Sequence, residues 1–140
     1  MSDLKIRLSA VTLDCRNMEE LAKFYEKLLN WKIHYSGGDY TVIGVPDTRM
    51  GFYPSITLQH NPEYLPPVWP EREGEQQQMA HLDFAVNDME KAVSHALKCG
   101  ARKADMQFNE NWTVMIDPEE HPFCLVAMKE IMESPDFGLL

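Results

Sequence analysis

The chain carries the same arrangement of apolar and polar positions twice, and the copies begin at Ala10 and His81, 71 positions apart (81 − 10). Each copy opens with a short run rich in Val, Leu and Phe, which predicts a strand. Apolar residues then recur at i, i+3, i+4 and i+7, the spacing of one buried helix face: Met18, Leu21, Ala22 and Tyr25, then Met89, Ala92, Val93 and Ala96. A repeat of this length indicates a duplicated supersecondary unit.

Polar residues with the chemistry of helix caps separate each strand from its helix. Asn17 is followed by Glu20 three residues on, and Asn87 is followed by Glu90, so both sites resemble capping boxes. The first helix is expected to end near Asn30, because Asn tolerates the left-handed conformation found after many helices. These signals predict one helix of about three turns in each copy.

Each copy leaves room for three more strands after its helix. We expect them in the first copy at Lys32–Ser36, Tyr40–Val45 and Ser55–His60, and in the second at Ala101–Gln107, Trp112–Asp117 and Phe123–Met128. The prediction is an α+β fold of two βαβββ modules in one chain. Module one covers about residues 7–60, a linker covers 61–79, module two covers 80–128, and a tail covers 129–140. Within the proline-rich linker, Glu71–Gln78 is expected to be a solvated polar stretch.

Composition narrows the class of partner. With 140 residues, 44% of them hydrophobic, the chain is long enough for one domain with its own core. The net charge of -9 argues against nucleic acid, whose phosphates need clustered Lys and Arg. The sequence shows neither a membrane-spanning apolar run nor a signal-peptide pattern, so no membrane partner is expected. Three cysteines without CxxC spacing predict reduced thiols and a cytoplasmic location.

Three segments resemble a known superfamily. Residues 21–31 (LAKFYEKLLNW) resemble its "FY…LLGW" motif, residues 81–88 (HLDFAVND) its second-module strand and cap, and residues 117–125 (DPEEHPFCL) its closing hairpin. This is the glyoxalase/bleomycin-resistance/dioxygenase superfamily, also called vicinal oxygen chelate, and residues 64–70 (YLPPVWP) resemble a bacterial glyoxalase-like subgroup. The resemblance implies two curved sheets that form a half-barrel around a cleft, with the helices outside.

The resemblance also implies where a metal would bind. The family's four ligand positions fall on Ala10, Gln59, His81 and Cys124. Ala10 cannot coordinate, Gln59 offers only a neutral amide oxygen, and Cys124 is a soft ligand that hard divalent ions bind poorly. A catalytic zinc site needs three good protein ligands and an open position. We therefore expect no metal cofactor in the usual place.

Polar and aromatic residues on the same strand faces are expected to line the cleft: Thr12, Asp14, Gln59, His81, Asp83, Trp112 and Cys124. His81 is either a strand histidine paired with Asp83 or a functional group of the cleft. Asp14 is interpreted as part of a structural network, and Cys124 as a small buried side chain rather than a nucleophile. His34, His60, His95 and His121 share no ligand spacing and are expected at the surface or in turns.

The functional hypothesis is a protein that binds a small organic molecule in the inter-module cleft without the usual metal, as the resemblance to antibiotic-sequestering members implies. The alternative is a divalent-metal-dependent lyase, isomerase or dioxygenase of the same superfamily. A third possibility is an interaction module whose cleft is filled by side chains. Whether any reaction is catalysed stays open at this point. Tyr64 and Trp69 in the linker need a surface to cover, and the resemblance implies a homodimer.

The superfamily motifs have glycine at two positions where this chain has Asn30 and Glu120. Glycine is used there because the turn needs a positive φ. We therefore predict positive φ at both residues.

Overall fold

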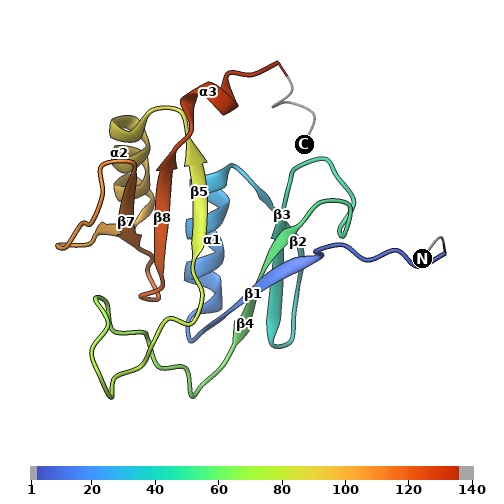
Figure 1. The fold of residues 1–140 in the computed structure, drawn as a ribbon. Coiled ribbons are helices and arrows are strands. Elements are labelled where there is room, and N and C mark those ends of the chain that lie inside the picture. The colour runs from blue at the N-terminus through green and yellow to red at the C-terminus, as the bar shows by residue number, and fades with distance from the viewer. Residues whose placement is uncertain (1–2, 136–140) are drawn as a thin grey trace. The chain divides into compact units, whose positions relative to one another are not determined.

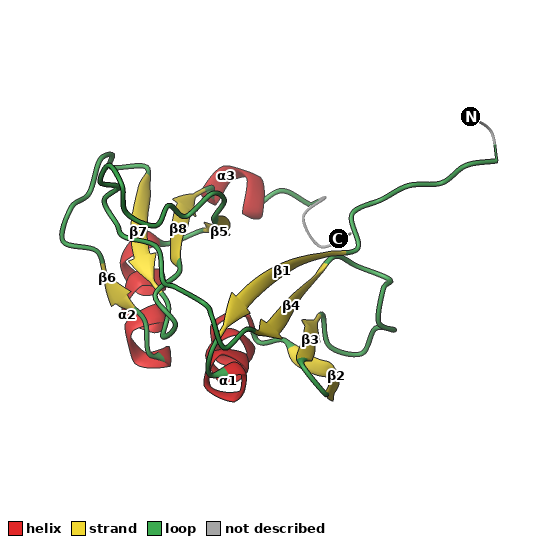
Figure 2. Cartoon of the chain, turned by 90° about the horizontal axis from the view of Figure 1, so that it is seen from below, coloured by secondary structure: helices red, strands yellow, loops and turns green. Residues whose placement is uncertain are grey.

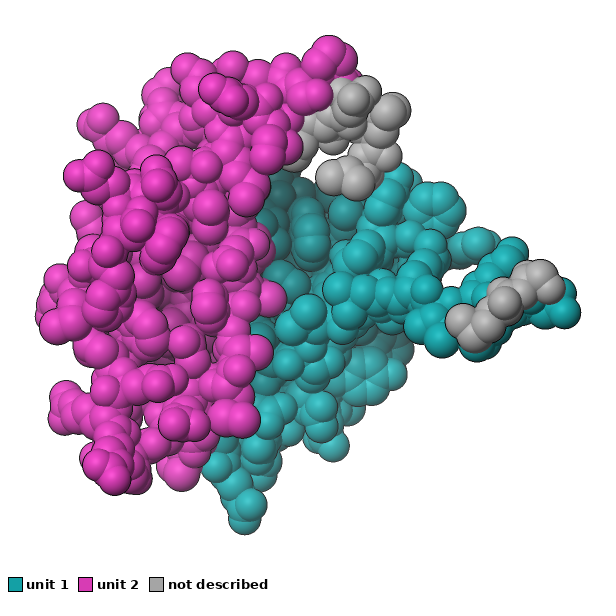
Figure 3. Space-filling model, viewed as in Figure 1, with its two compact units in different colours: residues 1–64 teal, residues 65–140 magenta. Residues whose placement is uncertain are grey.

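The computed structural model describes residues 3–135 of the chain. The chain forms two compact units, the first ending at Tyr64 and the second beginning at Leu65. Figure 3 shows them in teal and magenta. The residues from Leu65 onward, most of the expected linker, thus belong to the second unit. The last five residues of the expected tail, 136–140, lie outside the described residues. None of the helices between residues 3 and 135 combines the length and apolarity needed to cross a membrane.

Each unit has one four-stranded sheet and the same order of elements (Figure 1). The first contains β1 Ala10–Cys15, α1 Met18–Leu29, β2 Lys32–Gly37, β3 Tyr40–Gly44 and β4 Ser55–His60. The second contains β5 Leu82–Val86, α2 Met89–Cys99, β6 Arg102–Lys103, β7 Trp112–Ile116, β8 Pro122–Ala127 and the short α3 Lys129–Met132. The sheet orders, β1-β4-β3-β2 and β5-β8-β7-β6, are equivalent, and the outer pairs β1/β4 and β5/β8 are parallel. The predicted α+β fold of two βαβββ modules is confirmed.

Helix α1 forms because its apolar residues fall on one face and both of its ends are capped. Leu21, Ala22, Phe24 and Tyr25 are buried, and the helix packs against β3 and β4 of its own sheet. Figure 2 shows α1 against one face of that sheet. Asn17 Oδ1 accepts a hydrogen bond from the Glu20 amide at 3.0 Å, as predicted.

The start of α2 corrects one prediction. The cap is Asp88 rather than Asn87: the Asp88 carboxylate accepts from the Lys91 amide at 3.1 Å, and its φ of -142° is extended. Asp88 is also the residue that the 71-residue offset aligns with Asn17. A cap side chain must reach the amide three residues on, and Asn87 stands one position too early.

The strand expected at Ala101–Gln107 is wrong beyond Lys103, because β6 has only two residues. Past that point the backbone makes one more bond to β7, from the Ala104 N–H to the Val114 carbonyl, and a side chain then takes over as partner. The Gln107 amide accepts from the Val114 N–H at 2.8 Å and donates to the Val114 and Ala104 carbonyls at 2.9 and 2.8 Å. The chain from residue 104 to 111 is therefore a loop held beside the sheet.

The second sheet buries side chains on both faces. Phe123, Leu125 and Met115 alternate with residues of the opposite face and are almost fully buried. The opposite face carries a separate cluster, Ala104, Val114, Ile116 and Cys124, against which Trp69 and Val126 pack. This second cluster supports the candidate site described below.

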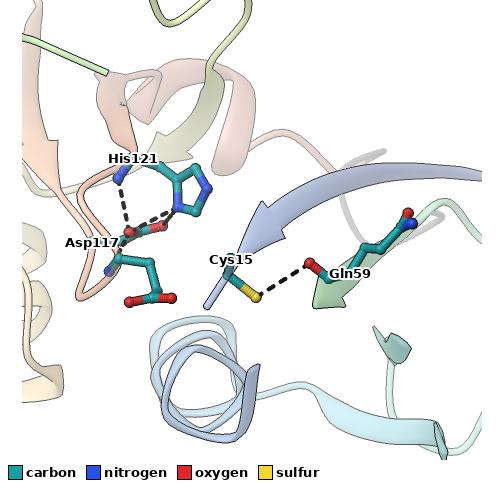
Figure 4. A network of polar contacts seen from close by, with 5 residues as sticks. Cys15, Gln59, Asp117 and His121 are labelled. Atoms are coloured by element: carbon teal, nitrogen blue, oxygen red, sulfur yellow. Dashed lines mark hydrogen bonds and ion pairs between the residues drawn. The ribbon is translucent and has the colours of Figure 1, made fainter. Parts of the chain in front are cut away.

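The turn between β7 and β8 is organised by Asp117, whose side chain is fully buried. Its carboxylate accepts from the backbone amides of Glu119 and His121 and pairs with His121 Nδ1 at 2.8 Å (Figure 4). Glu120 has φ 70° and Asn30 has φ 54°, so the positive φ predicted at both is confirmed.

His121 lies in the turn before β8, as expected, and its side chain is only 14% exposed because it lies against the buried Asp117 carboxylate. The expectation is wrong for His34, which lies within β2. His34 is half-buried, and its Nε2 lies 2.9 Å from the Val45 carbonyl oxygen.

Candidate functional site

The second unit contains a cavity of about 250 Å³ that is open to solvent. Aromatic and apolar side chains form most of its wall, and a few polar ones complete it. The lining residues are Trp69, Gln78, His81, Phe108, Trp112, Val114, Pro122 and Cys124. A concave, mainly apolar surface with a few polar groups is the usual form of a small-molecule site.

The base of the cavity is one face of the second sheet. Side chains two residues apart on a strand share a face, so β7 presents Trp112 and Val114 together, and β8 presents Pro122 and Cys124. Registers across the strands align them, since Val114 and Asp83 both lie opposite Cys124. Strand alternation therefore gathers residues from three strands on one surface.

Loops supply the rest of the wall. Trp69 and Phe108 come from different loops and meet edge to face, with ring centroids 5.9 Å apart. Gln78 and His81 lie on either side of Met79, which has φ 59°. A non-glycine residue costs free energy in this region, and such strain is found where a structure holds side chains in functional positions.

Three ionisable side chains meet at the site: His81, Asp83 and Cys124. His81 Nε2 lies 3.1 Å from Asp83 Oδ1. Donor atoms of His81, Asp83 and Cys124 all lie within 4.8 Å of one another. Burial raises the pKa of the Cys124 thiol to about 11, and the negative charge and hydrogen bond of Asp83 act in the same direction. Cys124 is thus a thiol rather than a thiolate at neutral pH, which makes it a poor nucleophile.

The predicted cleft residues divide between the two units. His81, Asp83, Trp112 and Cys124 are brought together in the second unit; all but Asp83 line the cavity, and Asp83 pairs with His81 beside it. Thr12, Asp14 and Gln59 lie in the first unit, where all three are exposed and Asp14 stands opposite Gln59 in the β1/β4 register.

Within the first unit, the predicted residues have local partners. Asp14 accepts a hydrogen bond from the side-chain amide of Asn61 at 3.2 Å, as expected of a structural network. Thr12 lies opposite Thr57 and Ala10 opposite Ser55. A ligand-binding role for Thr12, Asp14 and Gln59 stays a prediction.

The sequence did not predict Phe108, Gln78, Val114 and Pro122 as wall residues. Val114 and Pro122 are apolar strand residues on the same face as Trp112 and Cys124. Phe108 is an aromatic residue in a polar loop, and the argument applied to Trp69, that such a ring needs a surface to cover, would have found it. Gln78 was assigned to a solvated stretch, and this is wrong, because it lines the cavity. Nothing in its local sequence distinguishes it from Gln76 and Gln77.

The family model of the glyoxalase-like domain matches residues 10–126, which include both repeats. The chain belongs to this family. No curated protein matches the sequence.

Solved structures of similar fold agree with this assignment. A glyoxalase/bleomycin resistance protein/dioxygenase family enzyme from Burkholderia phytofirmans is 15% identical with a TM-score of 0.63, over 87% of this chain and 98% of that one. Trypanothione-dependent glyoxalase I of Leishmania major is 16% identical with a TM-score of 0.64, over 92% and 91%. The fosfomycin resistance protein FosX of Mesorhizobium loti is 15% identical with a TM-score of 0.60, over 98% and 100%. At these identities the likeness shows the fold alone.

Members of this superfamily often use a metal, so the donors in the second unit need a test of fit. His81, Asp83 and Cys124 are nitrogen, oxygen and sulfur donors of the kinds that zinc accepts. Zinc binds at about 2.0–2.3 Å, so two ligand atoms on one ion lie at most about 4.6 Å apart. The donors of this glyoxalase-like chain all lie within 4.8 Å of one another, close to that limit, and the Cys124 thiol must lose a proton before it can bind. The donor types therefore fit zinc, whereas the protonation of Cys124 opposes binding.

Proposed function

We propose that this glyoxalase-like protein binds a small organic molecule in the cavity of its second unit, without a resident metal ion. The observation that carries the proposal is the wall itself. Trp69, Phe108 and Trp112 line a space of about 250 Å³, and Gln78, His81 and Cys124 add polar groups to its wall. Aromatic rings supply most of the contact area in such sites, and a few polar groups fix orientation.

The size and charge of the cavity restrict the ligand. Its volume lies below the usual range of about 300–1,000 Å³ for ligand pockets, which favours a molecule of one or two rings. No Lys or Arg is among the lining residues, and the carboxylate of Asp83 lies next to His81. An anionic ligand would therefore lack a counter-charge, so we propose a neutral or cationic ring compound.

Two features support the absence of a resident metal. Ala10 has no ligand atom at one of the four family positions. His81 and Asp83 already pair with each other, and the Cys124 thiol is protonated and donates a hydrogen bond to Asp83. Each of the three possible metal ligands therefore already has a polar partner in the protein and does not need an ion.

The test of binding uses intrinsic tryptophan fluorescence, since Trp69 and Trp112 line the cavity. A library of one- and two-ring compounds should contain members that quench the emission with saturation. Trp112→Ala should weaken their binding about tenfold, the effect of losing one aromatic wall. The matched control is Tyr40→Ala, since Tyr40 opens β3 as Trp112 opens β7, and both are partly exposed, at 45% and 38%. If no compound saturates, or both variants lose affinity equally, the proposal is wrong.

The metal part is tested separately by elemental analysis of protein purified without chelators. We expect less than one divalent ion per chain and no rise in melting temperature with zinc or nickel. A tight one-to-one ion that is lost in His81→Ala would favour the second candidate, a metal-dependent lyase, isomerase or dioxygenase. His81, Asp83 and Cys124 would then hold the ion, which supplies Lewis-acid chemistry when bound.

A further inference from the structure

A carboxylate lies beside two of the residues that line the cavity. Asp83 lies opposite Cys124 in the β5/β8 register, so both side chains leave the sheet on the face that forms the base of the cavity. Asp83 Oδ1 is 3.1 Å from His81 Nε2, and both His81 and Cys124 line the cavity. The Asp83 side chain is 59% exposed, so its oxygens are open to a molecule bound there.

The cavity wall offers little to balance the charge of this carboxylate. None of the lining residues is Lys or Arg, and His81 supplies a positive charge only when it is protonated. The Cys124 thiol donates a hydrogen bond to Asp83 but stays uncharged. A carboxylate has about four acceptor positions, so the contacts with His81 and Cys124 leave room for an N–H of a ligand. A cationic ligand would supply the missing counter-charge.

The rest of the wall suits an aromatic group. Trp69, Phe108 and Trp112 line the cavity, and the rings of Trp69 and Phe108 are in edge-to-face contact. Aromatic side chains offer large apolar contact areas to a ring. The volume of about 250 Å³ is small for a ligand pocket, which favours one ring with a short chain. The net charge of -9 also favours the approach of cations over anions.

We infer that the cavity takes a small arylalkyl amine in its protonated, cationic form. The aromatic group of the ligand packs among Trp69, Phe108 and Trp112, and its ammonium group donates a hydrogen bond to the Asp83 carboxylate. This inference rests on the proposed function and adds the charge and the chemical class of the ligand.

The test uses three probes that share one ring and nearly the same chain length but differ in charge: 2-phenylethylamine, 2-phenylethanol and phenylacetate. Dissociation constants are measured by quenching of tryptophan emission and checked by calorimetry. The amine should bind at least fivefold more tightly than the alcohol, because a charged donor makes the stronger hydrogen bond to a carboxylate. Phenylacetate should bind most weakly. Because Asp83 is exposed, high salt should screen its charge and weaken the amine but not the alcohol.

Two variants of Asp83 identify the group responsible. Asp83→Asn keeps the shape of the side chain and removes its charge, so the amine should bind about fivefold more weakly while the alcohol is unchanged. Asp83→Lys should reverse the order, so that phenylacetate binds more tightly than the amine. Asp105→Asn is the matched control, because Asp105 is an exposed carboxylate of the same unit that does not line the cavity. It should leave all three dissociation constants unchanged.

The outcomes separate this inference from the proposed function. Unchanged binding of the alcohol by Asp83→Asn shows that the variant is folded. Equal affinity of the amine and the alcohol would overturn the inference and leave the proposed function intact. An equal loss of both probes in Asp83→Asn would assign a structural role to Asp83 and would also overturn it. If none of the three binds although the compound library gives other ligands, the assigned class is wrong; if nothing binds at all, the proposed function fails with it.

Discussion

At the scale of single residues, Glu120 combines an unfavourable backbone conformation with a favourable ion pair. Glu120 occupies the left-handed region with φ 70°, where the motif of this family has glycine. Its carboxylate pairs with Arg102, and both side chains are about half exposed. A surface pair of this kind contributes at most about 1 kcal/mol, which is similar to the cost of the backbone conformation. The ion pair and the strain therefore nearly cancel.

Glu120→Gly should consequently change the free energy of unfolding by less than its backbone gain of about 1 kcal/mol, with a net stabilisation. Measured in Arg102→Ala, where the ion pair is already absent, the same substitution should show the full gain. Urea denaturation of the four proteins gives both values. A loss of stability in the Arg102→Ala background would contradict our interpretation of this turn.

The Cys124 thiol gives a second prediction at this scale. Its pKa is raised from 9.0 to about 11 by burial and by Asp83. Asp83→Asn removes the negative charge, so this pKa should fall and alkylation by iodoacetamide at about pH 10 should accelerate several-fold. Mass spectrometry resolves Cys124 from the more accessible Cys99, which should react at an unchanged rate. Asp14→Asn, in the first unit, is the control.

The same raised pKa makes stability depend on alkaline pH. Between about pH 9 and 11 the thiol ionises in the unfolded chain but stays protonated in the folded one, so the folded state binds more protons and stability falls as pH rises. Below pH 9 the thiol is protonated in both states and contributes no slope. Cys124→Ala should lack this part of the alkaline loss in urea denaturation. An unchanged slope would mean that the folded thiol titrates normally.

At the scale of elements, the short strand β6 is completed by a side chain. Gln107 makes three hydrogen bonds with the backbone of Ala104 and Val114, and Ala104 N–H donates to the Val114 carbonyl at 3.1 Å. This arrangement holds the loop that carries Phe108 beside β7. The loop thus extends the sheet, because the Gln107 side-chain amide makes the hydrogen bonds to β7 that a backbone peptide group would otherwise make.

Gln107→Ala should destabilise the second unit by about 1–3 kcal/mol, because it leaves the buried Val114 N–H without its partner. Hydrogen exchange at the Val114 amide should accelerate, and binding of ring compounds should weaken as Phe108 loses its support. Gln76→Ala provides the comparison, since that side chain is exposed and makes only a local bond to Gln77. Unchanged exchange at Val114 would show that the loop is held by other contacts.

At the scale of the whole molecule, residues 4–8 carry an exposed apolar face. Leu4, Ile6 and Leu8 are 53%, 81% and 61% exposed, and they alternate with polar residues as in a strand with one buried face. No strand of the described chain pairs with this segment. In an antiparallel pair of two copies centred on Lys5, Asp3 of each copy lies opposite Arg7 of the other. The two resulting opposite-charge pairs outnumber the one like-charge pair, Lys5 opposite Lys5, at the centre. This charge complementarity favours a second copy of the chain as the partner, in line with the expected homodimer.

We therefore predict a dimer by light scattering, weakened at least tenfold in Ile6→Lys. Leu97→Lys, at a residue of α2 that is 47% exposed, should leave the dimer intact. Asp3→Arg and Arg7→Asp should each weaken association, and the double exchange should restore it. A wild-type monomer at all concentrations, or a double variant no better than the single ones, would contradict pairing through this segment.

The sequence by itself determined the repeated module, the buried helix faces, the positive φ at Asn30 and Glu120, and the family. These features depend on local spacing and on the conformational limits of single residues, which can be read along the chain. The two-residue alternation of the strand that begins the second module also predicts that His81 and Asp83 share one face. Tertiary structure decided which loops close the cavity.

Only the folded chain brings Trp69 against Phe108 and turns Gln78 toward the same space. Only in the folded chain does the Gln107 side chain take the place of a strand's peptide group beside Val114. Likewise, His121 is largely buried only because the fold places it against the Asp117 carboxylate. These contacts join residues whose local sequence has no periodic signal, so they are fixed by packing and by the need to pair buried polar groups. The sequence thus specified the two sheets, and the packing of loops on the second one created the site.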